Sequence, residues 1–255
     1  IHIIGSGNAF CMSGRGQTCF LIESTDNSKM LIDCGATSLQ QITRQKVSMS
    51  GVDRLLITHF HGDHIGGIPF LLLHLHFMEH RTDSFEILGP VGIADVITRL
   101  NEILYPGIEF GFEIKFTEIN AISDSKPTVT GPFSIEGVPV SHRPESLGYR
   151  INDQSKSKRL FNCDFAFSGD TRWCASLVEL YNEVDVGILE LSFIEQPAGG
   201  SSHLSLPEII DYRSVLKVNR LYFNHLYDEL ATQVIETNKT RSIGLPLTDG
   251  QTIEF

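Results

Sequence analysis

Tryptophan, basic residues and long apolar runs are scarce in this sequence. The chain has one Trp and 20 Lys and Arg against 31 Asp and Glu, so its formal net charge is −11 over 255 residues. Phosphate contacts come from clustered Lys and Arg, and this balance therefore disfavours a surface for extended nucleic acid, although a nuclease with a local basic patch stays open. The longest apolar stretch, 65–77, is interrupted by His74 and His76 and falls short of the roughly 18–20 residues that a membrane span needs. We expect no membrane anchor.

The cysteines show neither a disulfide pattern nor a zinc-finger pattern. They are odd in number, widely spaced and contain no Cys-x-x-Cys: Cys11, Cys19, Cys34, Cys163 and Cys174. The chain opens directly on a strand-like run, 1–4, with no basic and apolar leader ahead of it. Reduced thiols and a cytoplasmic location are the expectation.

Short apolar runs alternate with helical periods along the whole chain. The predicted strands are 2–4, 19–22, 30–32, 54–57, 85–88, 113–116, 133–140, 148–151, 159–161, 186–191 and 221–223. The predicted helices are 39–46, 68–79, 93–104, 173–181, 206–216 and 231–236, and the polar segments 121–132 and 152–158 are predicted loops. Ser205 and Glu208 form a capping-box pattern at the start of the helix that begins at 206. No linker or change of composition divides the chain, which favours one α/β domain over 1–255.

Histidine is abundant, with ten residues, and three of them follow the apolar run 55–57 in the segment Thr58-His59-Phe60-His61-Gly62-Asp63-His64. His59 and His61 are two positions apart, so on an extended segment they point to the same side. Gly62 permits a sharp turn that lets Asp63 and His64 converge on them. Three imidazoles and a carboxylate exceed what one tetrahedral ion with an open position needs, which predicts two transition-metal ions. The alternative is a chance cluster of surface histidines.

The motif His-x-His-x-Asp-His after an apolar strand resembles the metallo-β-lactamase superfamily. That resemblance implies an α+β fold, a four-layer αββα sandwich, with a metal site at one edge. Other parts of the chain resemble its further motifs in order: Asp33 in Leu31–Gly35, His142 after Val138–Ser141, Asp170 in Phe167–Thr171 and His225 in Tyr222–His225. The resemblance implies that His59, His61 and His142 hold one ion, that Asp63, His64 and His225 hold the other, and that Asp170 bridges them.

The resemblance favours Zn²⁺ for both ions, with Mn²⁺ or Fe²⁺ as alternatives. Asp33 is expected to orient a metal-bound imidazole without binding metal itself, or else to be an ordinary turn residue. Taken alone, His142 or His225 could be a hydrogen-bonded structural residue, and Asp170 could belong to a Ser-Gly-Asp-Thr turn. The remaining histidines, His2, His74, His76 and His80, are expected to be ordinary, with His76 and His80 four positions apart on a solvated helix face.

Two further segments resemble ribonuclease Z and its small phosphodiesterase relatives. One is Pro144–Arg150 after His142, and the early Gly5–Gly7 and Gly14–Thr18 segments fit the same branch. The other pairs Glu190 in Leu189–Phe193 with His203 in Ser202–Ser205, which occupy the places of an acid and a histidine that assist leaving-group protonation in ribonuclease Z. A polar residue before the helix at 206 is the alternative role for His203.

The chain departs from ribonuclease Z where that enzyme carries its tRNA-binding arm, between the third-motif histidine and the fourth-motif aspartate. Asp170 follows His142 by only 28 positions (170 − 142). The basic cluster of that interval, Lys156, Lys158 and Arg159, is too small for a tRNA footprint. The resemblance therefore carries over the catalytic centre and not the tRNA substrate. A small-molecule or short phosphodiester substrate is expected, and a homodimer is compatible with the resemblance.

The leading hypothesis is a metal-dependent phosphodiesterase in which the two ions share a bridging hydroxide. Asp63 is counted as a catalytic residue as well as a ligand, and His203, oriented by Glu190, protonates the leaving group. Three alternatives stay open. They are a carboxylic ester, thioester or lactone hydrolase at the same site, a ribonuclease Z-like tRNA 3′ endonuclease, and a non-catalytic metal-stabilised binding protein.

Overall fold

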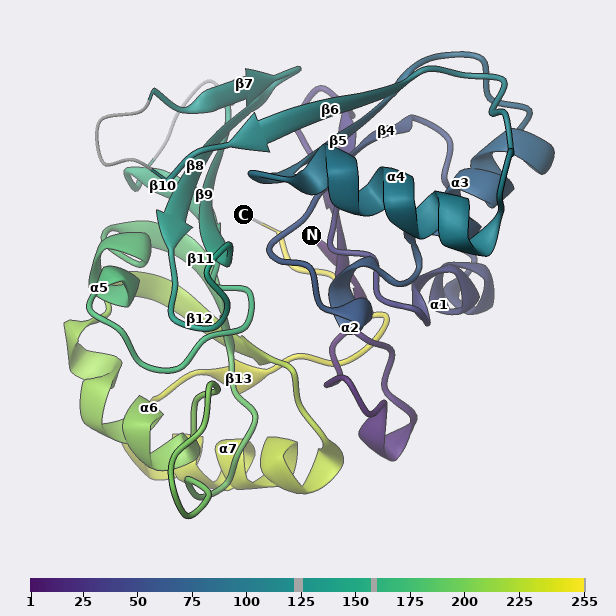
Figure 1. The fold of residues 1–255 in the computed structure, drawn as a ribbon. Coiled ribbons are helices and arrows are strands. Elements are labelled where there is room, and N and C mark those ends of the chain that lie inside the picture. Colours follow the sequence, from purple (N-terminus) through teal and green to yellow (C-terminus); the bar gives the residue numbers. More distant parts are fainter. Residues whose placement is uncertain (122–125, 157–159, 255) are drawn as a thin grey trace.

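The computed structural model describes residues 1–121, 126–156 and 160–254, which form two β-sheets packed face to face between helices (Figure 1). The first sheet has the order β1-β2-β3-β4-β5-β6. Its strands are β1 (His2–Gly5), β2 (Cys19–Glu23), β3 (Lys29–Ile32), β4 (Val52–Leu56), β5 (Phe85–Pro90) and β6 (Ile114–Ile119). Strands β1 to β3 pair antiparallel and β3 to β6 pair parallel. The carboxyl ends of β3 and β4 therefore meet at one edge of this sheet.

The second sheet has the order β13-β12-β11-β10-β9-β8-β7. Its strands are β7 (Thr128–Thr130), β8 (Phe133–Pro139), β9 (Leu147–Asp153), β10 (Cys163–Phe167), β11 (Val184–Glu190), β12 (Val218–Asn224) and β13 (Leu245–Pro246). Strands β7 to β10 form an antiparallel meander, and β10 to β13 are parallel. The carboxyl ends of β10, β11 and β12 therefore share an edge.

Helices cover the outer face of each sheet (Figure 1). The first sheet carries α1 (Ser38–Gln45), α3 (Ile68–Phe77) and α4 (Ile93–Leu104), and the second carries α5 (Ser176–Leu180), α6 (Leu206–Tyr212) and α7 (Asp228–Arg241). Shorter pieces are α2 (Gly62–Ile65), η1 (Met12–Gly14) and η2 (Arg213–Val215). Within the described ranges, none of these helices combines the length and apolar character needed to cross a bilayer.

Alternating side chains along the strands build separate cores on the two faces of each sheet. On β2, Phe20 and Ile22 point into the core between the sheets, whereas Cys19 and Leu21 point into the core beneath α1, α3 and α4. The second sheet fills the shared core with residues such as Tyr149 on β9. Because both faces of each sheet are buried here, between the sheets and beneath the helices, the fold has the four layers that the resemblance implied.

Several element predictions are wrong in detail. The strand predicted over 159–161 is absent from the described part of that range, because 160–162 form bends and Arg159 lies outside the described residues; the observed strand is β10, which begins at Cys163. The predicted helix 173–181 begins only at Ser176, and the predicted loop 121–132 contains β7. The loop 152–158 begins inside β9, and its positions 157 and 158 are not described. The capping box of Ser205 and Glu208 is present at the start of α6, as predicted.

Candidate metal centre

The predicted site residues follow strand ends at one edge of the sandwich. Asp33 follows β3 and the segment 58–64 follows β4, in the first sheet. His142, Asp170 and His225 follow β8, β10 and β12, in the second sheet. Loops at the carboxyl ends of parallel strands are where α/β proteins place functional side chains. Both sheets therefore contribute side chains to one place.

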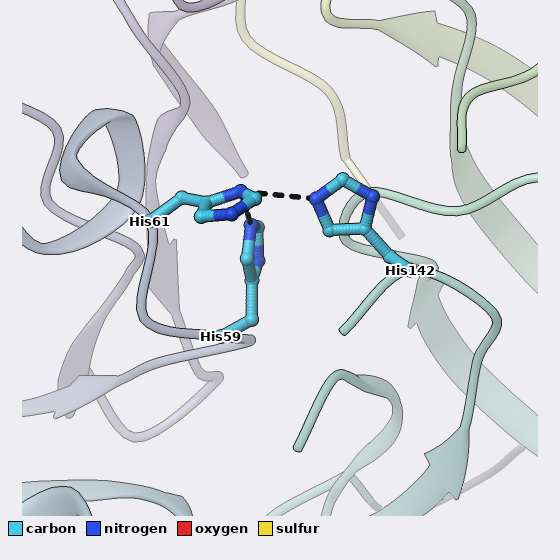
Figure 2. Close-up of side chains that lie close together, drawn as sticks. All are labelled: His59, His61 and His142. Carbon is cyan, nitrogen blue, oxygen red and sulfur yellow. Dashed lines mark hydrogen bonds between the residues drawn. The ribbon is translucent and has the colours of Figure 1, made fainter. Parts of the chain in front are cut away.

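Three imidazoles form the first group. His61 Nδ1 lies 3.2 Å from His59 Nε2 and 3.0 Å from His142 Nε2. Figure 2 shows the three rings pointing toward one another, with His142 approaching from the opposite side to His59 and His61. Nitrogens bound about 2.0–2.1 Å from one tetrahedral ion lie about 3.3–3.4 Å apart, so the observed spacing fits a shared Zn²⁺-like ion. These three residues could hold a metal ion.

Two imidazoles and two carboxylates form the second group: Asp63, His64, Asp170 and His225. His64 Nε2 lies 3.4 Å from Asp63 Oδ2 and 3.3 Å from Asp170 Oδ1. His225 Nε2 lies 3.5 Å from Asp63 Oδ2 and 3.4 Å from Asp170 Oδ2. Asp170 also reaches the first group, because its Oδ2 is 3.9 Å from His59 Nε2 and 4.0 Å from His142 Nε2. Asp170 thus lies between the two groups.

Buried nitrogens without partners support a metal in the second group. His64 Nε2 and His225 Nε2 are buried and have no hydrogen-bond partner among the described residues, although both face carboxylates. A buried polar atom normally finds a partner, and a nitrogen lone pair beside two carboxylate oxygens is a donor set that divalent transition metals take. The residues present therefore fit the implied ions.

The electrostatics of both groups suit a divalent cation. Burial alone would raise the pKa of Asp170, but the charges of His225 and His64 hold it well below its usual range. Burial lowers the pKa of His142 to about 4 and lowers that of His59 strongly. Metal binding requires charged carboxylates and neutral imidazoles, which describes Asp170, His59 and His142. Burial alone would lower the pKa of His64, but the charges of Asp170 and Asp33 raise it well above its usual range, so His64 would release a proton to a bound ion.

Neighbouring groups fix the orientation of two of these imidazoles. Asp33 is fully buried, and its Oδ2 accepts a hydrogen bond of 2.7 Å from His64 Nδ1. Thr58 holds that carboxylate by donating its backbone N–H to Oδ1 at 2.9 Å and its hydroxyl to Oδ2 at 2.9 Å. The carbonyl oxygen of Ser202 lies 3.2 Å from His142 Nδ1. Each contact leaves the opposite ring nitrogen, Nε2, facing the centre.

His203 and Glu190 lie beside the two groups. His203 Nδ1 is 3.0 Å from Glu190 Oε1, and a ring nitrogen of His203 lies within 4.8 Å of ligating atoms of His142 and Asp170. Burial alone would lower the pKa of His203, but the hydrogen bond and charge of Glu190 raise it to about 9. An imidazolium next to the proposed ions can donate a proton to an outgoing oxygen.

Some sequence interpretations near the site need correction. Gly62 is not a sharp turn: it begins α2 without a positive φ, and a Cβ there would meet nothing within 4 Å. His76 and His80 do not share a helix face, because α3 ends at Phe77. His76 Nδ1 instead accepts a hydrogen bond from the backbone of Gly111.

The sequence prediction gave no role to two hydroxyls that the structure places in the site. Thr58 supports Asp33, as described above, and the Ser192 hydroxyl contacts both Glu190 and the ring of His225. Both lie within two positions of a predicted site residue. A polar residue in an otherwise apolar strand end is the signal that could have pointed to them.

Comparison with known proteins places the chain in a family. The family model described as "Anti-Pycsar protein Apyc1" matches residues 1–245. The chain belongs to this family.

Among curated proteins, ribonuclease Z of Listeria monocytogenes is 32% identical over 157 residues, which are 60% of this chain and 49% of the relative. Ribonuclease Z of Haloferax volcanii is 30% identical over 156 residues, 61% of this chain and 47% of the relative. The chain thus spans about half the length of the curated relatives it matches.

Solved structures share the fold of this Apyc1-family chain. The metallo-β-lactamase fold protein YhfI from Bacillus subtilis aligns with a TM-score of 0.76 at 20% identity, covering 98% of this chain and 96% of that one. The short form of human tRNase Z aligns with a TM-score of 0.76 at 21% identity, covering 99% of this chain and 98% of that one. A diphosphatase from the PhnP family aligns with a TM-score of 0.75 at 19% identity, covering 100% of this chain and 96% of that one. The predicted metallo-β-lactamase fold and the resemblance to ribonuclease Z are confirmed.

Proposed function

We propose that this chain is a metal-dependent hydrolase that cleaves a phosphodiester bond in a small or short substrate. His59, His61 and His142 would hold one divalent ion, Asp63, His64 and His225 the other, and Asp170 would contact both. When bound, such ions supply Lewis acidity and lower the pKa of water to about 7, which makes hydroxide available at neutral pH.

The observation that carries this proposal is the position of the His203–Glu190 pair beside both ligand groups. Glu190 is completely buried and holds His203 Nδ1 at 3.0 Å, so the other ring nitrogen, Nε2, is the atom free to deliver a proton. An alkoxide leaving from phosphorus is strongly basic and needs that proton as its bond breaks. Without this acid, the two ligand groups would suffice only for substrates whose leaving group departs easily without a proton.

Substrate size follows from the connection between β9 and β10. The chain leaves only positions 154–162 between these strands, which lie within the interval from His142 to Asp170 where the sequence predicts that the tRNA-binding arm of ribonuclease Z is missing. Of the basic cluster in this interval, Lys156 pairs with Asp164 at 3.2 Å, and Lys158 and Arg159 lie outside the described residues. A short or small phosphodiester is therefore favoured over tRNA.

The test separates leaving groups by their basicity. Protein loaded with Zn²⁺ or Mn²⁺ is assayed on an alkyl phosphodiester and on a nitrophenyl phosphodiester. His203→Ala should lower turnover of the alkyl ester by about 10²- to 10⁴-fold, the usual contribution of a general acid, and should change the nitrophenyl ester far less. Glu190→Gln should act in the same direction. His80→Asn, which removes an exposed imidazole far from the site, is the control.

Equal losses on the two esters would contradict the role of His203. Activity that survives complete metal removal would contradict the role of the ions. Binding of ions without any hydrolysis would favour the non-catalytic alternative.

A second candidate is hydrolysis of a carboxylic ester, thioester or lactone at the same ligand groups. The same metal-binding side chains support hydrolysis of these esters as well as hydrolysis of a phosphodiester, since metal activation of water serves both reactions. A lactone and a thioester added to the assay distinguish the two, and precursor tRNA tests the ribonuclease Z-like alternative. A homodimer stays a prediction from the resemblance.

A further inference from the structure

The hydroxyl of Ser192 connects the predicted acid pair to the predicted metal ligands. Ser192 lies two positions after Glu190 and is only 7% exposed. Its Oγ lies 2.9 Å from Glu190 Oε2 and 2.7 Å from His225 Nδ1. The rings of His225 and His203 also stack, with centroids 5.1 Å apart and planes within 11°, but Ser192 is the side chain that hydrogen-bonds to both Glu190 and His225.

The direction of these two hydrogen bonds follows from the surroundings of Glu190. Its Oε1 accepts from the backbone N–H of Thr171 at 3.0 Å and faces His203 Nδ1 at 3.0 Å and the N–H of Leu204 at 3.3 Å. A carboxylate can only accept hydrogen bonds. The Ser192 hydroxyl must therefore donate to Glu190 Oε2.

Once Ser192 donates its single proton to Glu190, its oxygen can only accept from His225. The proton of the neutral imidazole then sits on Nδ1, and Nε2 carries the lone pair. Nε2 is the buried atom that lacks a hydrogen-bond partner and faces Asp63 and Asp170. The hydroxyl thus selects the one tautomer of His225 that can bind a metal ion.

We propose that Ser192 is a positioning residue that holds His225 in its metal-binding tautomer and ties it to the Glu190–His203 pair. This inference rests on the proposed function. A carboxylate at this position could also accept from His225, as Asp33 does from His64, but it would lie beside Glu190 and repel it. A hydroxyl both accepts from the ring and donates to the neighbouring carboxylate, so it serves His225 without placing a second charge beside the acid pair.

The experiment measures metal affinity directly. Chelator-stripped protein is titrated with Zn²⁺ in competition with a chromogenic chelator, for the wild type, Ser192→Ala, Ser192→Thr and Ser192→Val. Ser192→Ala should weaken one of two binding steps by about 10- to 100-fold, as losses of a ligand's supporting hydrogen bond do. Ser192→Thr keeps the hydroxyl and should retain the wild-type affinities, whereas Ser192→Val has the same shape without the hydroxyl and should lose them.

Ser24→Ala is the matched control. Ser24 is also buried and hydrogen-bonded to a carboxylate, that of Asp26, but it lies at the β2–β3 turn. Its replacement should leave both binding steps unchanged. A nitrogen-15 and proton spectrum of the histidine rings in the Zn²⁺-loaded protein gives a second readout, in which the His225 Nδ1–H proton should be hydrogen-bonded in the wild type and should lose that hydrogen bond in Ser192→Ala.

The outcomes separate this inference from the proposed function. If the wild type binds fewer than two ions, the proposed function fails before any variant is compared. If the wild type binds two ions and Ser192→Ala binds both as tightly, with an unchanged ring spectrum, the role of Ser192 is wrong and the proposed function stands. Equal losses in Ser192→Ala and Ser24→Ala would likewise overturn it. If Ser192→Thr and Ser192→Val do not fold, the comparison of Ser192→Ala with Ser24→Ala decides.

Discussion

Replacing Asp33 by Asn should weaken metal binding while leaving the fold nearly intact. Asp33 has a φ of 54°, a left-handed conformation that Asn also adopts readily, so the backbone is not strained. The Asn oxygen can still accept from the backbone N–H of Thr58, as Asp33 Oδ1 does at 2.9 Å. The Asn amide, however, would point N–H groups at His64 Nδ1, where Asp33 Oδ2 now accepts at 2.7 Å.

His64 can relieve that clash by moving its proton to Nε2, which removes the lone pair proposed to bind metal. Loss of such a support typically costs 10- to 100-fold in metal affinity, or about 1.4–2.8 kcal/mol. The free energy of unfolding in chelator should change by less, because burial raises the pKa of Asp33 and Asn removes a charge that is costly to bury.

Asp33→Ala provides the contrast. It leaves the Thr58 N–H and His64 Nδ1–H without their acceptor, at about 1–3 kcal/mol each, and adds about 1–2 kcal/mol for Ala in the left-handed region. Urea unfolding in excess chelator should therefore separate Asp33→Ala from Asp33→Asn by several kcal/mol, and metal titration should show both weakened. If Asp33→Asn bound both ions with wild-type affinity, the reasoning about His64 would be refuted.

Two further predictions concern the frame that holds the site. At Gly35, a Cβ would lie 2.2 Å from the carbonyl oxygen of Asp63, so Gly35→Ala should destabilise the protein by about 1–3 kcal/mol and weaken metal binding. Gly62→Ala, in the same motif but with open space at the Cβ, should change the free energy of unfolding by less than about 1 kcal/mol. Urea unfolding and metal titration of the pair check both, and a Gly35→Ala protein with wild-type stability would contradict the packing argument. Tyr149→Phe should cost about 1–2 kcal/mol of stability without changing metal affinity, because the hydroxyl of Tyr149 on the second sheet donates to the carbonyl of Ile57 after β4 at 2.7 Å. Thermal unfolding of apo and loaded protein tests this, and a selective loss of metal affinity would contradict it.

The ligand motif was visible in the sequence because its members are close together along the chain. His59, His61, Asp63 and His64 needed only local spacing, whereas His142, Asp170 and His225 were recognised by resemblance to family motifs. Ser192 was missed because its role depends on a ring that lies 33 positions away in the sequence. A hydroxyl carries no signal of its partner until the fold places the two together.

Element boundaries were misplaced where tertiary contacts override the local pattern. Strand β10 contains the buried Asp164, a residue type that is uncommon in strands, and here Asp164 accepts a hydrogen bond from the backbone of Asp153 and pairs with Lys156. Trp173 was assigned to the predicted helix 173–181 because of the spacing of apolar residues in that segment. It lies before α5 and stacks on Tyr212, with ring centroids 3.9 Å apart and planes within 6°. Both errors come from partners distant in sequence.

The proposed metal ligands are divided between the two sheets, so they become available one after another while the chain is synthesised. Of the proposed ligands, those in the segment 59–64 are made first, and their partners are one another and the earlier Asp33 until His142 follows β8. Asp170 comes later, and His225 becomes available only after β12 has been made. Because a domain's long-range contacts form late, the centre is among the last parts of this protein to assemble. A nascent chain therefore carries only part of the proposed ligand set until β12 has been made, and the capacity to bind both proposed ions marks the docking of the second sheet on the first.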